Sequence, residues 1–204
     1  MFPFDAILFD VGGVLLTNGW DHCERALVLD QFHLDREAFE SRHAAPNDAW
    51  ERDFITAKEY LDTTVFYEPR AFSQEEFLAA IFAQSRCLPD GALGIVKELA
   101  ASDKCVLGSL NNEAREPNDY RFGQFELRQY FQVAFSSCYV GLRKPGAAIF
   151  RRALDILGKP AERVLFIDDR AENLAGAASV GMKTVRFQGS EALRRALEGL
   201  DVLS

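Results

Sequence analysis

The chain has 204 residues, of which 48% are hydrophobic and 12% aromatic, so it is long enough to bury a sizeable core. Its formal net charge of −8 argues against general binding to nucleic acid or to an anionic membrane, because both need basic protein surface. Local binding of an anionic small molecule remains compatible with this charge.

No targeting segment is predicted, because "MFPFDAILFDVGGVLL" lacks a basic leader and its apolar run is broken by Asp5 and Asp10. No transmembrane span is predicted either. The four cysteines lie far apart without a C-x-x-C pair, which favours buried thiols in a reducing compartment over a disulfide or zinc framework. They are Cys23, Cys87, Cys105 and Cys138. These features together predict a cytoplasmic protein.

The first predicted strand lies in "AILFDVGGVL" (6–15) and ends at an acid, Asp10, which two glycines follow closely. Strand-forming residues such as Ile, Leu and Phe can run through the middle of a buried sheet. A carboxylate at the end of such a strand loses hydration and needs either a partner or a function. Asp10 is therefore the first candidate for a functional residue.

Residues 18–88 carry helix signals and almost no strand signal. Two pairs have capping-box spacing, Thr56 with Glu59 and Ser73 with Glu76. Apolar residues recur at helical intervals in "RALVLDQF" and "EEFLAAIF". We predict a small all-helical cap here.

The predicted cap is entered through "TNG" and left through "LPDG", which are both rich in turn-forming residues. The first strand would then rejoin the later part of the chain across the cap. The sequence therefore predicts a discontinuous core of residues 1–17 and 89–204, with the cap over residues 18–88.

The second half of the chain alternates short strand-like runs with amphipathic segments, which predicts a parallel sheet with helices on both faces, a Rossmann-like α/β fold. The predicted strands are 104–110, 133–137, 163–168 and 183–187. Helix signals agree with this alternation. Asp90 is the expected N-cap of one helix, Pro145 begins another that ends near Gly158, and Gly181 closes a third that starts near Ala171.

Polar residues follow the predicted strands at the point where each strand ends. Asp10 ends the first, Ser109 the second, and Asp168 with Asp169 the fourth, while Lys144 precedes the helix that begins at Pro145. In open α/β sheets, ligands bind at the carboxyl ends of the strands. Four separate segments are therefore predicted to converge on one site.

Four segments in this order resemble the motifs of the haloacid dehalogenase superfamily of hydrolases: "FDVGGVL", "LGSLNN", "RKP" and "FIDDRAEN". Each is weak alone, but four in order at domain-scale spacing are specific. The resemblance is to the branch whose small helical cap follows the first strand, which includes sugar phosphatases and the N-terminal phosphatase of epoxide hydrolases.

The resemblance implies a Mg²⁺-dependent phosphatase that hydrolyses a small phosphorylated metabolite, with a sugar phosphate as the favoured substrate. Asp10 would be the nucleophile, forming a transient aspartyl-phosphate, and also a metal ligand. Asp169 and the backbone carbonyl of Gly12 would bind the metal directly, and Asp168 would act directly or through water. Mg²⁺ suits such an all-oxygen site.

The remaining roles implied by the resemblance are supporting ones. Ser109 would donate a hydrogen bond to the phosphoryl group, and Lys144 would neutralise both Asp10 and the developing charge. Asn111 or Asn112 would fill the polar position that follows Ser109 in relatives. Asn173 would lie behind the metal ligands rather than on the metal.

Gly12 departs from the pattern, because many phosphatases of the superfamily carry an aspartate there as general acid and base. Such a group contributes roughly 10²–10⁴-fold to the rate, and glycine cannot supply it. Two alternatives therefore stay open. A metal-independent 2-haloacid dehalogenase needs no acid for a halide, although the aromatic residue expected near this position is absent. A weakly active protein that binds a phosphorylated ligand is the other.

Seven cap residues are candidates to face the substrate, although charged and aromatic residues on helices are more often packed or solvated. They are His22, Arg25, Arg42, His43, Trp50, Glu51 and Asp53. The favoured segment is "AWERDF" (49–54), where Trp50 would pack on an organic leaving group and Arg52 or Asp53 would hydrogen-bond it. The isolated histidines predict no second metal site. We expect a monomer or a homodimer.

Overall fold

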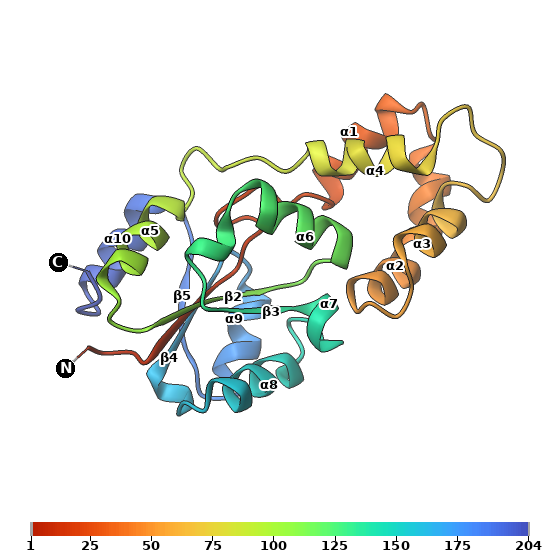
Figure 1. The fold of residues 1–204 in the computed structure, drawn as a ribbon. Helices are drawn as coiled ribbons and strands as arrows, with labels where there is room; N and C mark the ends of the chain where they lie inside the picture. Colours follow the sequence, from red (N-terminus) through yellow and green to blue (C-terminus); the bar gives the residue numbers. More distant parts are fainter. Residues whose placement is uncertain (1, 204) are drawn as a thin grey trace.

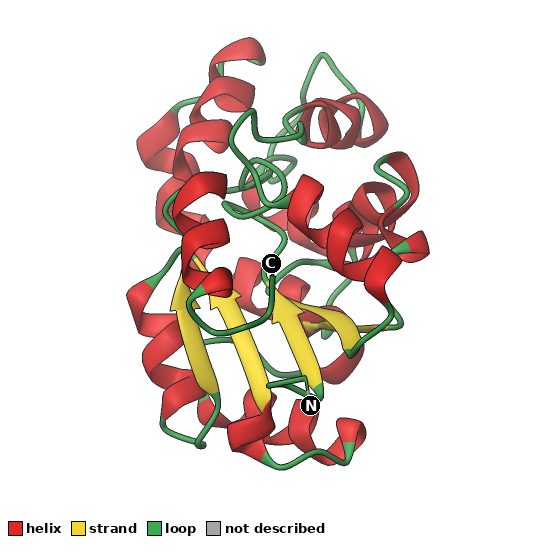
Figure 2. Cartoon of the chain, turned by 90° about the vertical axis from the view of Figure 1, so that its left-hand side faces the viewer, coloured by secondary structure: helices red, strands yellow, loops and turns green. Residues whose placement is uncertain are grey.

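The computed structural model describes residues 2–203, and its centre is one sheet of five parallel strands in the order β3-β2-β1-β4-β5. The strands are β1 (Ala6–Phe9), β2 (Val106–Asn111), β3 (Val133–Ser136), β4 (Val164–Asp168) and β5 (Lys183–Arg186). Figure 2 shows the strands with helices packed along both sides. The predicted Rossmann-like α/β fold is confirmed.

Both faces of the sheet are covered, which explains why β1 and β4 are almost entirely apolar and fully buried. Side chains from α5 (Leu93–Ser102), α6 (Arg115–Gln124) and α10 (Ser190–Glu198) pack on one face, with Ile7 and Phe9. The helices α8 (Ala147–Leu157) and α9 (Ala171–Ala178) pack on the other. Three short elements complete the core: η1 (Leu127–Gln129), α7 (Ser137–Val140) and η2 (Ala161–Arg163).

Four helices between β1 and α5 form the cap, which Figure 1 shows set to one side of the sheet. They are α1 (His22–Gln31), α2 (Arg36–Glu51), α3 (Ala57–Thr64) and α4 (Gln74–Ala83). The cap has its own apolar cluster around Trp50, Tyr60 and Phe77. Both predicted capping boxes are present, at the start of α3 and of α4. The domain boundaries themselves stay a prediction.

The two chain segments that join the cap to the core lie side by side. The Thr17 amide donates to the Arg86 carbonyl at 2.9 Å, and the Thr17 hydroxyl donates to the Gln84 carbonyl at 2.6 Å. The Leu88 amide donates to the Leu15 carbonyl at 3.1 Å. The chain therefore enters and leaves the cap through one hydrogen-bonded pair of segments.

Two predicted helix starts are wrong. Asp90 does not cap α5, whose N-cap is Ala92 without a side-chain hydrogen bond; its carboxylate instead accepts from the Ser190 amide at 3.1 Å, at the start of α10. Pro145 lies before α8, which begins at Ala147. There the Pro145 carbonyl packs so closely on α9 that a Cβ at Gly176 would lie 2.3 Å from it.

None of the helices within residues 2–203 is both long and apolar enough to cross a bilayer. All four cysteines are free thiols, but only Cys138 is fully buried, whereas Cys23 and Cys87 are exposed. The expectation of four buried thiols is therefore wrong. The cytoplasmic location and the oligomeric state stay predictions.

Candidate active site

Three carboxylates meet at the carboxyl edge of the sheet. Asp10 directly follows β1 and Asp168 ends β4, and because Phe9 is in register with Ile167, the two acids are neighbours. Asp169 follows, and the three residues can place carboxylate oxygens within 4.8 Å of one another. The site lies at the central strand β1, where successive strands depart to opposite sides, the usual place for a ligand in such sheets.

Lys144 joins two of these acids. Its Nζ lies 2.9 Å from Oδ1 of Asp10 and 2.8 Å from Oδ2 of Asp168, and the residue is only 4% exposed. Asn112 holds the Lys144 backbone, because its Nδ2 donates to the Lys144 carbonyl and its Oδ1 accepts from the Lys144 amide, both at 2.9 Å. The lysine is therefore fixed with its charge between two carboxylates.

Asp168 is fully buried, and its carboxylate accepts three hydrogen bonds besides that from Lys144. Asn173 Nδ2 donates to both of its carboxylate oxygens, at 3.1 and 3.0 Å, and the Arg170 amide donates to Oδ1 at 2.8 Å. These bonds, with the ion pair to Lys144, balance the desolvation of the carboxylate. Asp168 is thus held rigidly behind the more accessible Asp169.

The protein charges of the site favour a cation. Burial raises the pKa of Asp10 to about 7, and the negative charge of Asp168 raises it further while Lys144 opposes the rise. Burial and the charge of Asp168 also raise the pKa of Asp169. Asp169 Oδ1 is buried without a hydrogen-bond partner within residues 2–203. Crowded carboxylates with an unpartnered oxygen fit a hard divalent cation such as Mg²⁺.

The two glycines after Asp10 have different structural reasons. Gly13 has φ +74°, and a Cβ there would lie 2.6 Å from Oδ2 of Asp169. Only glycine at this position therefore lets the loop that carries Asp168 and Asp169, the acidic loop, approach the turn after Asp10. A Cβ at Gly12 would lie 3.1 Å from Oδ1 of Asn18 and 3.8 Å from Nη1 of Arg121. Close approach of the acidic loop therefore depends on Gly13, whereas Gly12 leaves space beside two polar side chains.

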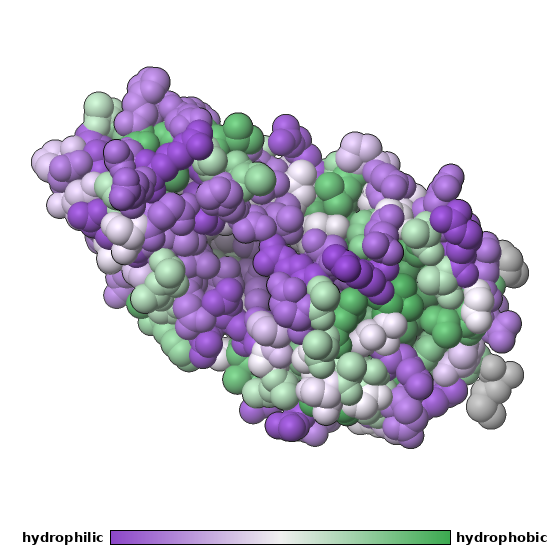
Figure 3. Space-filling model, turned by 180° about the vertical axis from the view of Figure 1, so that it is seen from behind, coloured by the Kyte–Doolittle hydropathy of each residue, from purple (hydrophilic) through white to green (hydrophobic). Residues whose placement is uncertain are grey.

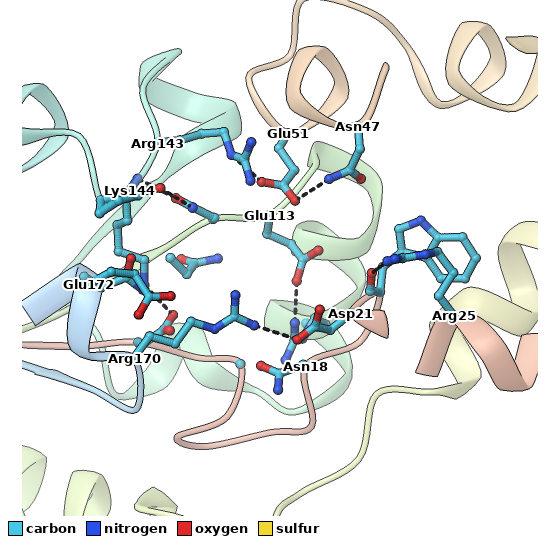
Figure 4. A pocket seen from close by; sticks show the side chains of 18 of the residues that line it. Asn18, Asp21, Arg25, Asn47, Glu51, Glu113, Arg143, Lys144, Arg170 and Glu172 are labelled. Carbon is cyan, nitrogen blue, oxygen red and sulfur yellow. Dashed lines mark hydrogen bonds and ion pairs between the residues drawn. The ribbon is translucent and has the colours of Figure 1, made fainter. Parts of the chain in front are cut away.

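A cavity of about 350 Å³ lies between this edge of the sheet and the cap, and almost all of its lining side chains are polar (Figure 4). The core contributes Asp10, Asn111, Asn112, Glu113, Arg121, Arg143, Lys144, Arg170 and Asn173. The cap helices contribute Arg25, His43, Asn47 and Glu51. Seen from behind, the surface around the junction of cap and core is also mainly hydrophilic (Figure 3).

The sequence model of the haloacid dehalogenase-like hydrolases matches residues 4–181. The chain belongs to this family. The predicted resemblance is therefore confirmed, and the chain is a hydrolase.

This hydrolase is 34% identical over 220 residues to bifunctional epoxide hydrolase 2 of Sus scrofa, covering 95% of this chain and 38% of that protein. It is 26% identical over 201 residues to sesquiterpene phosphatase astK of Aspergillus oryzae, covering 93% and 92%. A family enzyme of Bacteroides thetaiotaomicron, solved in complex with magnesium and inorganic phosphate, has TM-score 0.72 and 20% identity over 91% of this chain and 95% of its own. The chain spans well under half the length of the curated epoxide hydrolases that it matches.

The structure of the hydrolase brings most of the predicted site residues together. Asp10, Lys144, Gly12, Asn111 and Asn173 line the cavity, and Asp168 and Asp169 lie against Asp10 without lining it. Ser109 does not line the cavity: it is fully buried inside β2, and its hydroxyl has no hydrogen-bond partner within residues 2–203. This corrects the prediction that Ser109 contacts the phosphoryl group. The strand runs on to Asn111, so the open edge is reached two residues later.

Trp50 also lies elsewhere than predicted. It is 1% exposed, its ring stacks on Tyr60 with centroids 4.4 Å apart, and its Nε1 donates to Glu116 at 2.8 Å. This corrects the prediction that Trp50 packs on the leaving group, because the side chain is used in the cap core. Asp53 pairs with Arg115 and Arg52 with Asp48, so neither lines the cavity.

Of the other cap candidates, Arg25, His43 and Glu51 line the cavity of the hydrolase, whereas His22 and Arg42 do not. Sequence reasoning missed several further lining residues. They are Asn18, Asp21, Asn47, Glu113, Arg121, Arg143 and Arg170. Arg143 and Arg170 adjoin predicted motif residues, which is a usable signal, but nothing in the sequence marks Arg121.

Proposed function

We propose that this hydrolase cleaves a small, hydrophilic phosphate monoester, with a sugar phosphate as the favoured class, through an aspartyl-phosphate on Asp10. One observation carries the proposal: a buried carboxylate, Asp10, shares Lys144 with Asp168 at the base of a polar cavity that the cap covers. A negatively charged phosphoryl group needs concentrated positive charge around it before a carboxylate can attack.

The residues of the chain account for the first step. A carboxylate oxygen of Asp10 would form a bond to phosphorus while the bond between phosphorus and the ester oxygen breaks, leaving an alcohol or alkoxide. Lys144 would keep Asp10 ionised and oppose the charge on the phosphoryl oxygens. The Val11 amide, which donates to Oδ1 of Asp10 at 2.8 Å, would hold the carboxylate in orientation. Water then cleaves the aspartyl-phosphate and releases inorganic phosphate.

Mg²⁺ is the metal that the donor set fits best. Asp10 and Asp169, the carbonyl of Gly12, and Asp168 directly or through water would hold it. When bound, Mg²⁺ supplies positive charge against the phosphoryl oxygens. The Bacteroides relative, solved with magnesium and inorganic phosphate, supports this assignment.

The cavity lining supports a hydroxyl-rich leaving group. Asn47, Glu51 and Arg143 present an amide, a carboxylate and a guanidinium to the cavity from above the carboxyl edge. Such groups match the donors and acceptors of a sugar, whereas an apolar chain would remove water from them and offer no hydrogen bond in return. Substrates with long hydrocarbon chains should therefore be poor, even though one relative is a sesquiterpene phosphatase.

The test is a panel of four compounds assayed with Mg²⁺ and again with excess chelator: 4-nitrophenyl phosphate, a hexose phosphate, farnesyl phosphate and 2-chloropropionate. We expect Mg²⁺-dependent hydrolysis of the first two, with the hexose phosphate preferred, and none with Asp10→Asn. Halide release in chelator would overturn the proposal in favour of a dehalogenase. Binding of inorganic phosphate without hydrolysis of any ester would favour a phospho-ligand-binding protein.

A further inference from the structure

Arg121 is a buried cation beside the cavity that the proposed mechanism does not use. It lies on α6, is 2% exposed, and lines the cavity. Its Nη1 pairs with the carboxylate of Glu113, and its Nη2 donates to the Thr17 carbonyl at 2.6 Å. A guanidinium has five N–H donors, and Nε has no partner within residues 2–203. Buried donors without partners are unfavourable unless a ligand uses them.

The loop that follows Asp10 has glycine at two positions beside this guanidinium, so no side chain of the loop packs on it there. A Cβ at Gly12 would lie 3.8 Å from Nη1, and a Cβ at Gly19 would lie 3.2 Å from the same atom. Gly19 has φ +71°, a conformation that favours glycine in any case. The absence of both side chains leaves Nη1 at the edge of the space beside Gly12.

The position of Arg121 relative to the reacting atoms follows from the direction of attack. In phosphoryl transfer the attacking and leaving oxygens are roughly in line, so the leaving oxygen lies on the side of phosphorus away from Asp10. Lys144, Asp168 and Asp169 surround Asp10 at the base of the cavity. Arg121 lies instead beside Asn18 and Gly19, where the chain rises toward the cap.

The other arginines that line the cavity are each paired with carboxylates of the cap or of its entry. Arg25 pairs with Glu40, Arg143 with Glu51, and Arg170 with Asp21. The partner of Arg121 is Glu113, on the core; the same Nη1 lies nearest to Gly12 and Gly19, and Nη2 donates to the Thr17 carbonyl. Arg121 is thus the cation whose position is fixed by the core and does not depend on cap closure.

We propose that Arg121 donates a hydrogen bond to the leaving-group oxygen as its bond to phosphorus breaks, and that Glu113 positions the guanidinium. The inference rests on the proposed phosphatase function. The P–O bond breaks with both electrons going to oxygen, and the alkoxide charge is stabilised by the guanidinium. A guanidinium donates hydrogen bonds without giving up its proton, so the alkoxide takes its proton from water. This explains how glycine at position 12 is compatible with turnover.

A donor of this kind acts only while charge develops, so its value grows with the basicity of the leaving group. Loss of one comparable donor in an oxyanion site lowers turnover by about 10²–10³-fold. A nitrophenolate needs little stabilisation, whereas an alkoxide needs much. The loss on removing Arg121 is therefore expected to be large for alkyl esters and small for aryl esters.

The experiment compares kcat/KM for 4-nitrophenyl phosphate and for a primary alkyl phosphate at saturating Mg²⁺, in wild type, Arg121→Met and Arg121→Lys. We expect Arg121→Met to lose about 10²–10³-fold on the alkyl ester and less than 10-fold on the aryl ester. Arg121→Lys should recover part of the alkyl activity. Inorganic phosphate, which has no leaving group, should inhibit all three equally. Arg128→Met, which removes an exposed arginine paired with Asp119, is the control and should change nothing.

Glu113 provides a second test that leaves the arginine in place. Glu113→Gln should reduce alkyl turnover, but by less than Arg121→Met does, with KM unchanged.

The pH profile of the wild-type protein is a third test, and it needs no variant. Because a guanidinium acts without releasing a proton, alkyl turnover should not fall between pH 7 and 9. A fall above pH 7 would overturn the proposal, because burial raises the pKa of Glu113 to about 7 and such a fall would identify Glu113 as an acid.

Two further outcomes separate the role of Arg121 from the proposed function. Equal losses on both esters, with weaker inhibition by phosphate, would show that Arg121 binds the phosphoryl group, and would overturn the inference alone. A wild-type protein that hydrolyses neither ester would overturn the phosphatase function, and the role of Arg121 with it.

Discussion

Arg143 pairs with two carboxylates of the cap helix α2: its Nε lies 2.6 Å from Oε2 of Glu51, and its Nη1 lies 2.6 Å from Oδ1 of Asp48. Arg143 immediately precedes Lys144, which pairs with Asp10. One short loop of the core therefore joins the cap to the charge at the base of the cavity, as Figure 4 shows for Glu51, Arg143 and Lys144.

Arg143→Met should weaken closure of the cap and lower kcat/KM about 10-fold, because a hydrogen bond between charged groups contributes roughly 1.5 kcal/mol or more. The loss should shrink at high salt, where the wild-type pair is itself screened. Steady-state kinetics at two ionic strengths measure both effects. Arg52→Met is the matched control, because Arg52, which follows α2 directly, also pairs with Asp48 but stays within the cap. Equal kinetics for wild type and Arg143→Met would show that the pair does not hold the cap.

Magnesium should stabilise the folded chain through Asp169. Three carboxylates within 4.8 Å repel one another, and a bound cation removes that repulsion. We expect the melting temperature to rise by several degrees with millimolar Mg²⁺ in wild type, and not in Asp169→Asn. Calorimetric melting with Mg²⁺ or with chelator checks this. The same rise in the variant would mean that Mg²⁺ binds elsewhere.

Lys144→Met should abolish hydrolysis and also lower the melting temperature without metal. Removing the lysine leaves Asp10 and Asp168 buried beside each other without their shared cation. Breaking a buried ion pair on one side costs about 3–5 kcal/mol, less where one acid takes up a proton. Urea unfolding in chelator measures the loss. A melting temperature above that of wild type would contradict the ion-pair geometry.

His43 should make stability fall in mild acid. Burial lowers its pKa to about 4, and the charge of Arg25 adds to this while Glu40 opposes it; Nδ1 lies 2.8 Å from the Tyr60 hydroxyl. The unfolded chain, with a pKa near 6.5, binds the proton first, so stability is fully present above about pH 6.5 and is lost as the pH falls toward 4. The loss is on the order of 2–3 kcal/mol.

The difference between wild type and His43→Gln isolates this contribution from the carboxylates that also titrate in acid. The unfolding free energy should decrease less from pH 7 to pH 5 in the variant than in wild type. Parallel curves for the two proteins would show that His43 is protonated in the folded state.

Trp50→Phe should affect stability and leave substrate binding unchanged. The phenyl ring can still stack on Tyr60, but the hydrogen bond to Glu116 is lost, which costs about 1–2 kcal/mol. Trp50→Ala should cost about 3–5 kcal/mol. Chemical denaturation and KM for one ester distinguish the two roles. A large rise in KM at unchanged stability would instead show that Trp50 contacts the substrate.

The sheet and its carboxyl edge were predictable because buried parallel strands are continuous apolar runs, and a polar residue marks where each ends. Asp10 and Asp168 stand at such ends. Ser109 was misplaced because a buried serine looks the same as one at the end of a strand. Its neighbour two positions on, Asn111, occupies the open edge instead.

The cap side of the cavity was much less predictable. An aromatic residue such as Trp50 satisfies helical periodicity equally well facing the cap core or the substrate, and only packing against Tyr60 decides between them. Arg121 and Glu113 form their pair through the fold of α6 against the loop after β2, a contact that no local pattern encodes. Contacts between side chains that form only through tertiary structure have no characteristic spacing in the sequence and cannot be predicted from it.

The paired segments at Leu15–Thr17 and Gln84–Leu88 make the cap an exchangeable module. Because the chain leaves and returns at adjacent points, a different insert, or a short turn, could be closed at this position with little additional loop entropy. The turn after Asp10, Lys144, and the loop that carries Asp168 and Asp169 would keep their positions during such an exchange. Substrate choice in this architecture can therefore diversify by replacement of the insert while the reacting groups stay constant.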